Sequence, residues 1–184
     1  GPPGSGKTAL ARIIAMRTRS VFEPLNAVTA GVKELRELIA AAHQRRIHEE
    51  RKTIVFVDEI HRFNRAQQDA LLPDVENGKI TLIGATTENP FFSVVAPLLS
   101  RSQIFEFKRL EEEDVVRLLE NALAHPERGF PGVEVAAEPA ALAHIARYAE
   151  GDARRAMNAL EIALLTTPVE DGKMAITEEV AREC

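Results

Sequence analysis

The sequence begins GPPGSGKT, residues 1–8, and runs directly into ALARIIAMR, whose apolar residues recur at helical spacing. Glycines at positions 1 and 6, followed by Lys7 and Thr8, match the phosphate-binding loop pattern Gly-x-x-x-x-Gly-Lys-Ser/Thr completely. Glycines let successive backbone N–H groups point at one anion, and the N-terminus of a helix attracts negative charge. This stretch therefore predicts a site for the phosphates of a nucleotide, followed by a helix.

Every residue of this loop has an expected part in nucleotide binding. The predicted cradle consists of Gly1, Pro2, Pro3, Gly4, Ser5, Gly6, Lys7 and Thr8. Lys7 is expected to reach the terminal phosphates, and the Thr8 hydroxyl is expected to ligate Mg²⁺. A glycine-rich turn without a ligand is the competing interpretation, but the apolar helix that follows favours the phosphate loop.

The segment TIVFVDE, residues 53–59, supplies the acids that such a site needs. Residues 53–57 form a β-branched and aromatic run, which is typical of a strand buried on both faces of a parallel sheet. Ligands bind at the carboxyl ends of such strands. We therefore expect Asp58 to hold Mg²⁺ and Glu59 to orient and polarise the attacking water. The two acids could instead cap the next helix, but the upstream phosphate loop favours the catalytic interpretation.

Strand and helix patterns alternate through the first 108 residues, which predicts an α/β sandwich with a parallel sheet. The expected strand segments are VFEPLNAV (21–28), TIVFV (53–57), KITLIGATT (79–87) and QIFEFK (103–108). Pro24 marks the first of these as an edge or irregular strand, because proline cannot donate to a ladder. A long helix is expected to begin after Gly31, and another to end at ENG, residues 76–78.

The pattern becomes helical after Leu110. Helices are expected over EEEDVVRLLENALAH (111–125), over 139–149 and over 152–167, with a loop at HPERGFPG (125–132). Asp152 is the expected N-cap of the last helix. The predicted organisation is a nucleotide-binding α/β domain over residues 1–110, a small all-helical lid over 111–167, and the start of a further region over 168–184.

Composition limits the class of protein. The chain has 184 residues, 45% hydrophobic and 28% charged, with a net charge of −5, which is ordinary for a globular domain and unlike a basic nucleic-acid-binding one. The single cysteine, Cys184, excludes an internal disulfide or a cysteine-based zinc module within these residues. No apolar run approaches the ~18 residues that span a bilayer. The five histidines show no metal-ligand spacing. His61 follows Asp58, Glu59 and Ile60 and could support the residues of the site from behind, but a structural role is the favoured interpretation.

Several polar residues are weaker site candidates. Thr86, Thr87 and Asn89 lie at the C-terminal edge of an expected strand. Arg154 and Arg155 lie in the first turn of a helix, where the helix dipole opposes cations, so one of them is expected to face an anion.

Together the phosphate loop, FVDE (56–59), GATT (84–87), SR (100–101) before an expected strand and GDAR (151–154) in a helical lid resemble the AAA+ ATPases. The run VDEIHRFNRAQQDALLPDVENGKITLIGATTENPFFSVVAPLLSR, residues 57–101, resembles the replication-associated recombination protein A group within them. The resemblance implies ATP and Mg²⁺ as ligands. It places Thr87 at the first sensor of the γ-phosphate, Arg101 at an arginine finger that reaches a neighbouring subunit, and Arg154 at the second sensor, in the lid.

The resemblance also implies a biological setting. Members of this group are DNA-stimulated ATPases of DNA replication, recombination and repair that act at stalled forks or at single-strand/duplex junctions. It further implies a homo-oligomer (a tetramer), DNA with single-stranded ends, gaps or forks as partner, single-strand-binding protein as a further partner, and a bacterial cytoplasmic, nucleoid-associated location without membrane contact. A Holliday-junction branch-migration motor, a clamp-loader motor and a non-hydrolysing AAA+ scaffold are the alternatives.

Two parts of the AAA+ pattern are not found in these residues. They are the strand that feeds the phosphate loop and a C-terminal oligomerisation domain, of which residues 168–184 would be the threshold. We therefore expect these 184 residues by themselves to be poorly stable or inactive.

Overall fold

The computed structural model describes residues 1–125, 134–170 and 172–184. The chain divides into two compact units. The first consists of Gly1 and Gly6–Glu106, and the second of Pro2–Ser5 and Phe107–Cys184.

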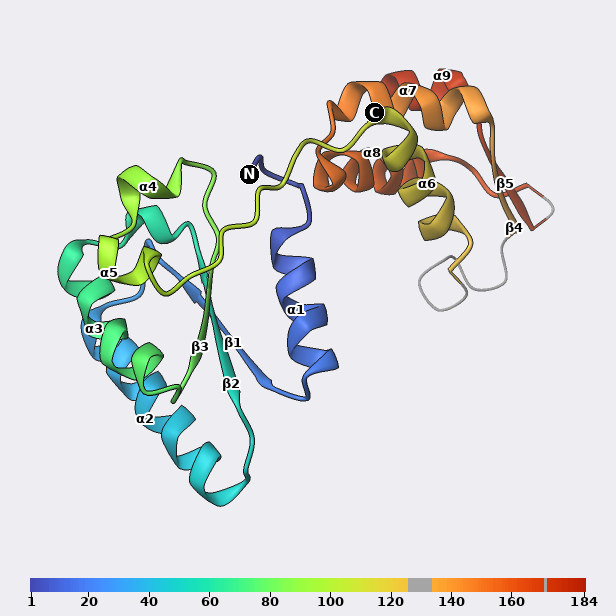
Figure 1. Cartoon of the computed structure of the whole chain (residues 1–184). Helices are drawn as coiled ribbons and strands as arrows, with labels where there is room; N and C mark the ends of the chain where they lie inside the picture. The colour runs from blue at the N-terminus through green and yellow to red at the C-terminus, as the bar shows by residue number, and fades with distance from the viewer. Residues whose placement is uncertain (126–133, 171) are drawn as a thin grey trace. The chain divides into compact units, whose positions relative to one another are not determined.

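The first unit is built on a parallel sheet, as the sequence predicts (Figure 1). Its strands are β1 (Val21–Asn26), β2 (Thr53–Asp58) and β3 (Thr81–Gly84), in the order β1-β2-β3. Pro24 lies in β1, which pairs with β2 alone, so this strand is at an edge, where a missing N–H is tolerated. The helices are α1 (Lys7–Arg17), α2 (Val32–His48), the 3-10 turn η1 (Ile60–Arg62), α3 (Arg65–Glu76), α4 (Pro90–Ser93) and α5 (Ala96–Leu99).

The central strand β2 is buried on both faces. Val55 and Val57 pack into a cluster with the apolar residues of α2 and α3, whereas Phe56 packs with Ala11 of α1. Figure 1 accordingly shows α1 on one side of the sheet and α2 with α3 on the other. The alternation along β2 therefore produces a three-layer unit whose strands all end at the same edge.

The strand expected at residues 103–108 does not form, and that expectation is wrong. A strand is defined by hydrogen bonds to a neighbour, and β3 pairs with β2 alone among the described strands. Phe105 is consequently 75% exposed, and Leu10 and Ile13 of α1 are also exposed. The sequence pattern identified an apolar, strand-like segment. It could not show that the described residues offer this segment no strand to pair with.

The second unit is mainly helical, as expected, and contains α6 (Glu112–Leu123), α7 (Pro139–Ala149), α8 (Ala153–Thr166) and α9 (Glu178–Glu183). Its core joins Val115 and Leu119 of α6 to Ile145 and Leu160 of the next two helices. It also contains a parallel pair, β4 (Glu134–Ala137) and β5 (Lys173–Ile176), which the helical interpretation missed. Residues 126–132 of the expected loop lie outside the described residues. Within the described ranges, no helix is long and apolar enough to cross a membrane.

Candidate functional site

The phosphate loop leads into α1 through a left-handed residue. Gly6 is the N-cap of α1 at φ 89°, a conformation that glycine adopts without steric cost, and no side chain caps the helix. The first N–H groups of a helix have no intrahelical acceptor. An anion can therefore satisfy the N–H groups that follow Gly6, and the helix dipole favours it there.

The loop is also connected to the end of β3. Lys7 Nζ donates to the carbonyl oxygen of Gly1 at 2.9 Å, and the Gly1 nitrogen donates to the carbonyl oxygen of Thr86 at 2.9 Å. The lysine and the start of the loop thus lie beside the residues that leave the sheet.

Residues 2–5 of the loop pack within the second unit. The backbone N–H of Ala153 donates to the carbonyl oxygen of Gly4 at 3.1 Å. Gly4 has φ 63°, and a Cβ on it would overlap the carboxylate of Asp152. Asp152 caps α8 as predicted, with Oδ1 accepting from the N–H groups of Arg154 (2.9 Å) and Arg155 (3.1 Å). The N-terminus of α8 therefore adjoins the middle of the phosphate loop.

The two predicted acids lie at the carboxyl end of β2. Asp58 is opposite Asn26 in the parallel register, and its Oδ1 accepts from the Glu59 N–H at 3.1 Å. Glu59 has φ 54°, an uncommon left-handed conformation for a residue with a side chain, of the kind that concentrates at functional sites. The next N–H, of Ile60, donates to the carbonyl oxygen of Ala85 at 2.9 Å. The turn that carries Glu59 is thereby attached to the exit of β3.

His61 contacts the catalytic candidate Glu59. Its Nε2 lies 3.3 Å from Glu59 Oε2 and 3.7 Å from Glu88 Oε1, and its Nδ1 lies 2.9 Å from Thr86 Oγ1. The side chain of His61 is only 9% exposed. The sequence interpretation of His61 as structural therefore missed a contact with the predicted water-activating carboxylate; the signal available was its spacing, two residues after Glu59.

The other polar residues after β3 differ in their surroundings. Thr86 is half-buried and faces His61, whereas Thr87, the predicted first sensor, is exposed. Asn89 caps α4 by accepting from the Phe91 N–H at 3.1 Å. The role of Thr87 stays a prediction.

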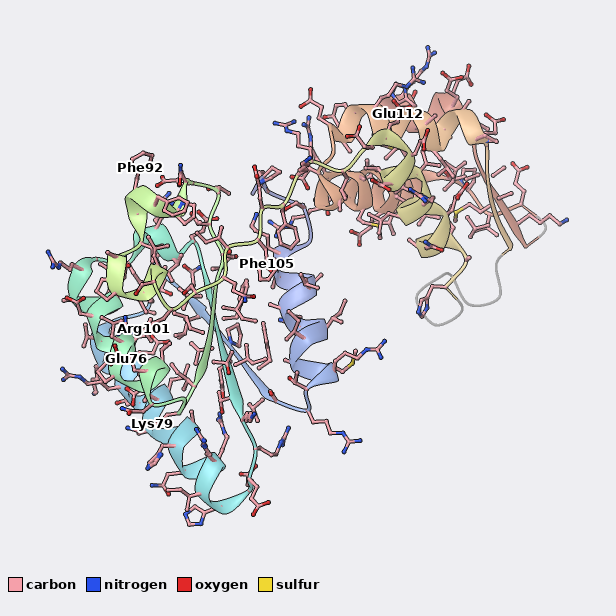
Figure 2. The ribbon with its side chains drawn as sticks, viewed as in Figure 1. Glu76, Lys79, Phe92, Arg101, Phe105 and Glu112 are labelled. Atoms are coloured by element: carbon pink, nitrogen blue, oxygen red, sulfur yellow. The ribbon has the colours of Figure 1, made fainter. Side chains whose placement is uncertain are left out.

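The predicted arginine finger is paired within its own chain. Arg101 lies 2.7 Å from Glu76 Oε1 and donates to the Pro97 carbonyl oxygen at 2.9 Å and to Ser100 Oγ at 3.1 Å. Figure 2 shows Arg101 and Glu76 side by side. These contacts lie on α3 and α5, and none of them is with Lys7 or Glu59. A partner for Arg101 is a feature that sequence reasoning missed.

The two arginines at the start of α8 differ in whether the side chain has a partner. Arg155 pairs with Glu150 at 3.6 Å and covers the ring of Tyr148 at 4.6 Å from its centroid. Arg154 is exposed, and its guanidinium has no polar partner in the part of the chain that the structure describes. Of the two, Arg154 is thus the one available to an anionic ligand.

The side chains predicted to hold Mg²⁺ suit a hard cation. Thr8 and Asp58 are both half-buried and offer a hydroxyl and a carboxylate oxygen, the donor type that Mg²⁺ prefers. No group of three or more histidine, cysteine or acidic side chains that could hold a metal by themselves occurs among the described residues.

Comparison with known proteins matches both parts of the chain. Residues 1–110 match the ATPase family associated with various cellular activities (AAA), and residues 132–184 match the AAA C-terminal domain. The replication-associated recombination protein A of Escherichia coli K12 is 46% identical over all 184 residues, and that of Bacillus subtilis is 42% identical over 185. The ATPase WRNIP1 of Dictyostelium discoideum is 43% identical over 164 residues, 89% of this chain and 18% of that protein.

The solved structures agree with the fold. A RuvB mutant of Thermotoga maritima superposes with a TM-score of 0.73 at 25% identity and covers all of this chain and 58% of that one. In the two bacterial comparisons the alignment includes the whole of this chain but only 41% and 43% of the relatives' length. The similarity therefore concerns an ATPase portion of longer proteins.

Proposed function

This chain belongs to the AAA family of ATPases, and from that premise we propose that it binds ATP with Mg²⁺ and hydrolyses it as the motor portion of a DNA replication and recombination protein. The bound nucleotide, the metal and the DNA are all parts of this proposal.

One observation carries the catalytic part of it. A continuous series of contacts leads from Lys7 to the carbonyl of Gly1, from the nitrogen of Gly1 to Thr86, and through His61 to Glu59. All of these residues belong to the first unit. These contacts support the proposal that the predicted phosphate-binding lysine and the predicted water-activating carboxylate act in one site at the carboxyl edge of the sheet, where ligands bind in such folds.

Each residue has a distinct task in the proposed reaction. The N–H groups at the start of α1 bind phosphate oxygens, and Lys7 neutralises charge on the terminal phosphates. Glu59 orients and polarises the attacking water. Thr8 and Asp58 would hold Mg²⁺, which supplies charge neutralisation at the phosphate oxygens when bound.

The two arginines and the sensor threonine complete the proposal. Arg154 contacts the nucleotide from the start of α8, and the absence of a polar partner for its guanidinium among the described residues supports this task. Arg101 reaches the nucleotide of a neighbouring copy, and Thr87 reads the γ-phosphate; both assignments rest on the resemblance to AAA+ proteins.

The setting of the reaction is likewise proposed from the relatives. We expect a homo-oligomer, with a tetramer as the first model to test, whose hydrolysis is stimulated by DNA with single-stranded ends, gaps or forks. Single-strand-binding protein is the proposed protein partner, and the bacterial nucleoid is the proposed location. A Holliday-junction branch-migration motor is the second candidate, favoured by DEIH (58–61), GATT (84–87) and the fold similarity to RuvB.

The decisive experiment measures ATP hydrolysis by the full-length protein with single-stranded, gapped, forked and four-way DNA. Stimulation by gapped or forked DNA supports the first candidate, and stimulation restricted to four-way DNA supports the second. Lys7→Ala and Glu59→Gln are the matched controls, and both should abolish hydrolysis. If wild-type protein and Glu59→Gln have equal rates, the assigned site is wrong.

A further inference from the structure

His61 occupies a position between two functional segments. One ring nitrogen faces the carboxylate of Glu59, and the other faces Thr86, which directly precedes the predicted sensor Thr87. We propose that His61 is a positioning residue, which holds the Glu59 carboxylate and links its orientation to the loop of residues 85–88. This inference rests on the proposed ATPase function and adds a residue to its machinery.

The two carboxylates that face His61 Nε2 favour the states of the imidazole in which this nitrogen carries a proton, because a lone pair there would face negative charge. Thr86 Oγ1 fits these states, since it accepts from the Glu88 N–H at 3.0 Å and can either donate to His61 Nδ1 or accept from it. A neutral imidazole that accepts at Nδ1 carries its proton on Nε2. A doubly protonated imidazole donates from both nitrogens. In each of these states Nε2–H faces the carboxylate of Glu59.

Two carboxylates compete for this donor. Glu59 Oε2 is nearer to Nε2, at 3.3 Å, and Glu88 Oε1 is at 3.7 Å. The side chain of Glu59 is 34% exposed and that of Glu88 is 60% exposed, so Glu59 is also the less solvated partner. Glu88 lies in the loop that carries Thr87. A shift of that loop therefore changes the distance from Glu88 to His61 Nε2, and with it the strength of the hydrogen bond that Nε2–H donates to Glu59.

The backbone restricts Glu59 independently. Its φ of 54° and the bond from the Ile60 N–H to the Ala85 carbonyl oxygen fix the turn on the exit of β3. The remaining freedom of Glu59 is in its side-chain torsions, and His61 contacts its terminal carboxylate. Backbone and side chain are therefore each attached to residues 85–88, so the loop that meets the γ-phosphate also orients the water-activating group.

The first test separates positioning from binding and from packing. In the full-length protein, His61→Ala should lower kcat by roughly tenfold to hundredfold, the loss expected when a reacting group is misplaced by about an ångström. Its affinity for a non-hydrolysable ATP analogue should stay within about twofold of wild type. His61→Gln, whose amide N–H can replace Nε2–H, should recover most of kcat. His48→Ala is the matched control, because His48 is exposed on α2 and its side chain bonds Gln44 alone among the described residues.

The second test concerns the link through Thr86. Thr86→Val keeps the side-chain shape and the carbonyl that accepts from Gly1 but removes the hydroxyl. It should lower kcat, and the loss in the His61→Ala/Thr86→Val double variant should be smaller than the product of the two single losses, because both changes break the His61–Thr86 bond, although Thr86→Val also removes the acceptor of the Glu88 N–H. Independent roles would give multiplied losses instead, and that result would overturn the proposal.

A readout without hydrolysis distinguishes failure of this inference from failure of the ATPase function. The ¹⁵N imidazole resonances of His61, assigned by their loss in His61→Gln, should show a protonated Nε2 that shifts in Glu59→Gln. If wild-type protein hydrolyses no ATP but this shift occurs, the ATPase function fails and the His61–Glu59 link stands. If wild type is active and His61→Ala retains kcat while melting at a lower temperature, His61 serves packing alone and the inference is wrong.

Discussion

The guanidinium of Arg101 and the carboxylate of Glu76 form an ion pair at 2.7 Å, between the second residue after α5 and the last residue of α3. Both side chains are 44% exposed. A pair this exposed contributes about 0–1 kcal/mol, so it can hold the arginine in place and still be exchanged for a stronger anion. A phosphate on a neighbouring copy would be such an anion.

We predict that Glu76→Gln makes Arg101 more available to a neighbouring subunit. The competing carboxylate is removed while the shape of the side chain is kept, so ATP turnover by the assembled full-length protein should rise, by at most about fivefold given the weakness of an exposed pair. Steady-state hydrolysis at saturating ATP measures this. Glu49→Gln, which removes the partner of Arg51 in another exposed pair, is the control. A lower turnover in Glu76→Gln would mean that Glu76 positions Arg101 for catalysis rather than restraining it.

Arg101→Ala should leave ATP affinity unchanged and reduce hydrolysis strongly. An arginine finger supplied in trans is worth about 10³–10⁵ in turnover in well-studied phosphoryl-transfer systems. Mixing Arg101→Ala with Lys7→Ala should partly restore activity, because some interfaces then join an intact phosphate loop to an intact finger. Titration of one variant into the other at constant total protein measures the rescue. Absence of rescue, with mixed assembly verified, would count against a shared site.

The order of strands and helices follows from the sequence where burial alone decides structure. The run at residues 53–57 forms the central strand because both of its faces are apolar, and Asp58 and Glu59 then fall at the ligand-binding edge. Contacts between residues far apart in the sequence, such as strand pairing and ion pairs, leave no comparable pattern of apolar residues. The segment at 103–108 has the pattern of a strand but no pairing strand among the described residues, and the ion pair of Arg101 joins residues 25 positions apart in the chain.

His61 shows the same limit of prediction from sequence within the candidate site. The spacing of His61 is compatible with a core residue or with a partner of Glu59, and only the turn at φ 54° brings its ring against that carboxylate. Motifs thus predict which residues would carry the proposed chemistry, whereas the contacts that orient them depend on local backbone conformation.

Gly4→Ala should destabilise the second unit. The substitution places a methyl group on the Asp152 carboxylate and forces a residue with a side chain to φ 63°, which by itself costs about 1–2 kcal/mol. Gly172→Ala is the matched control, because Gly172 has φ 76° but a Cβ there meets no described atom within 4 Å. Thermal unfolding of the two variants separates backbone strain from the steric clash. Equal losses of melting temperature would show that Gly4 and Asp152 are not in close contact in solution.

Arg154→Ala and Arg155→Ala should have opposite profiles. Arg155 has protein partners in Glu150 and Tyr148, so its loss should slightly lower the melting temperature and leave nucleotide affinity unchanged. Arg154 has no polar partner among the described residues and follows the helix N-terminus that adjoins Gly4, so its loss should weaken ATP binding. Loss of one charge-assisted hydrogen bond of about 1.5–3 kcal/mol corresponds to roughly tenfold to hundredfold in Kd. Titration with a fluorescent ATP analogue measures both variants, and weaker binding in Arg155→Ala than in Arg154→Ala would reassign the second sensor to Arg155.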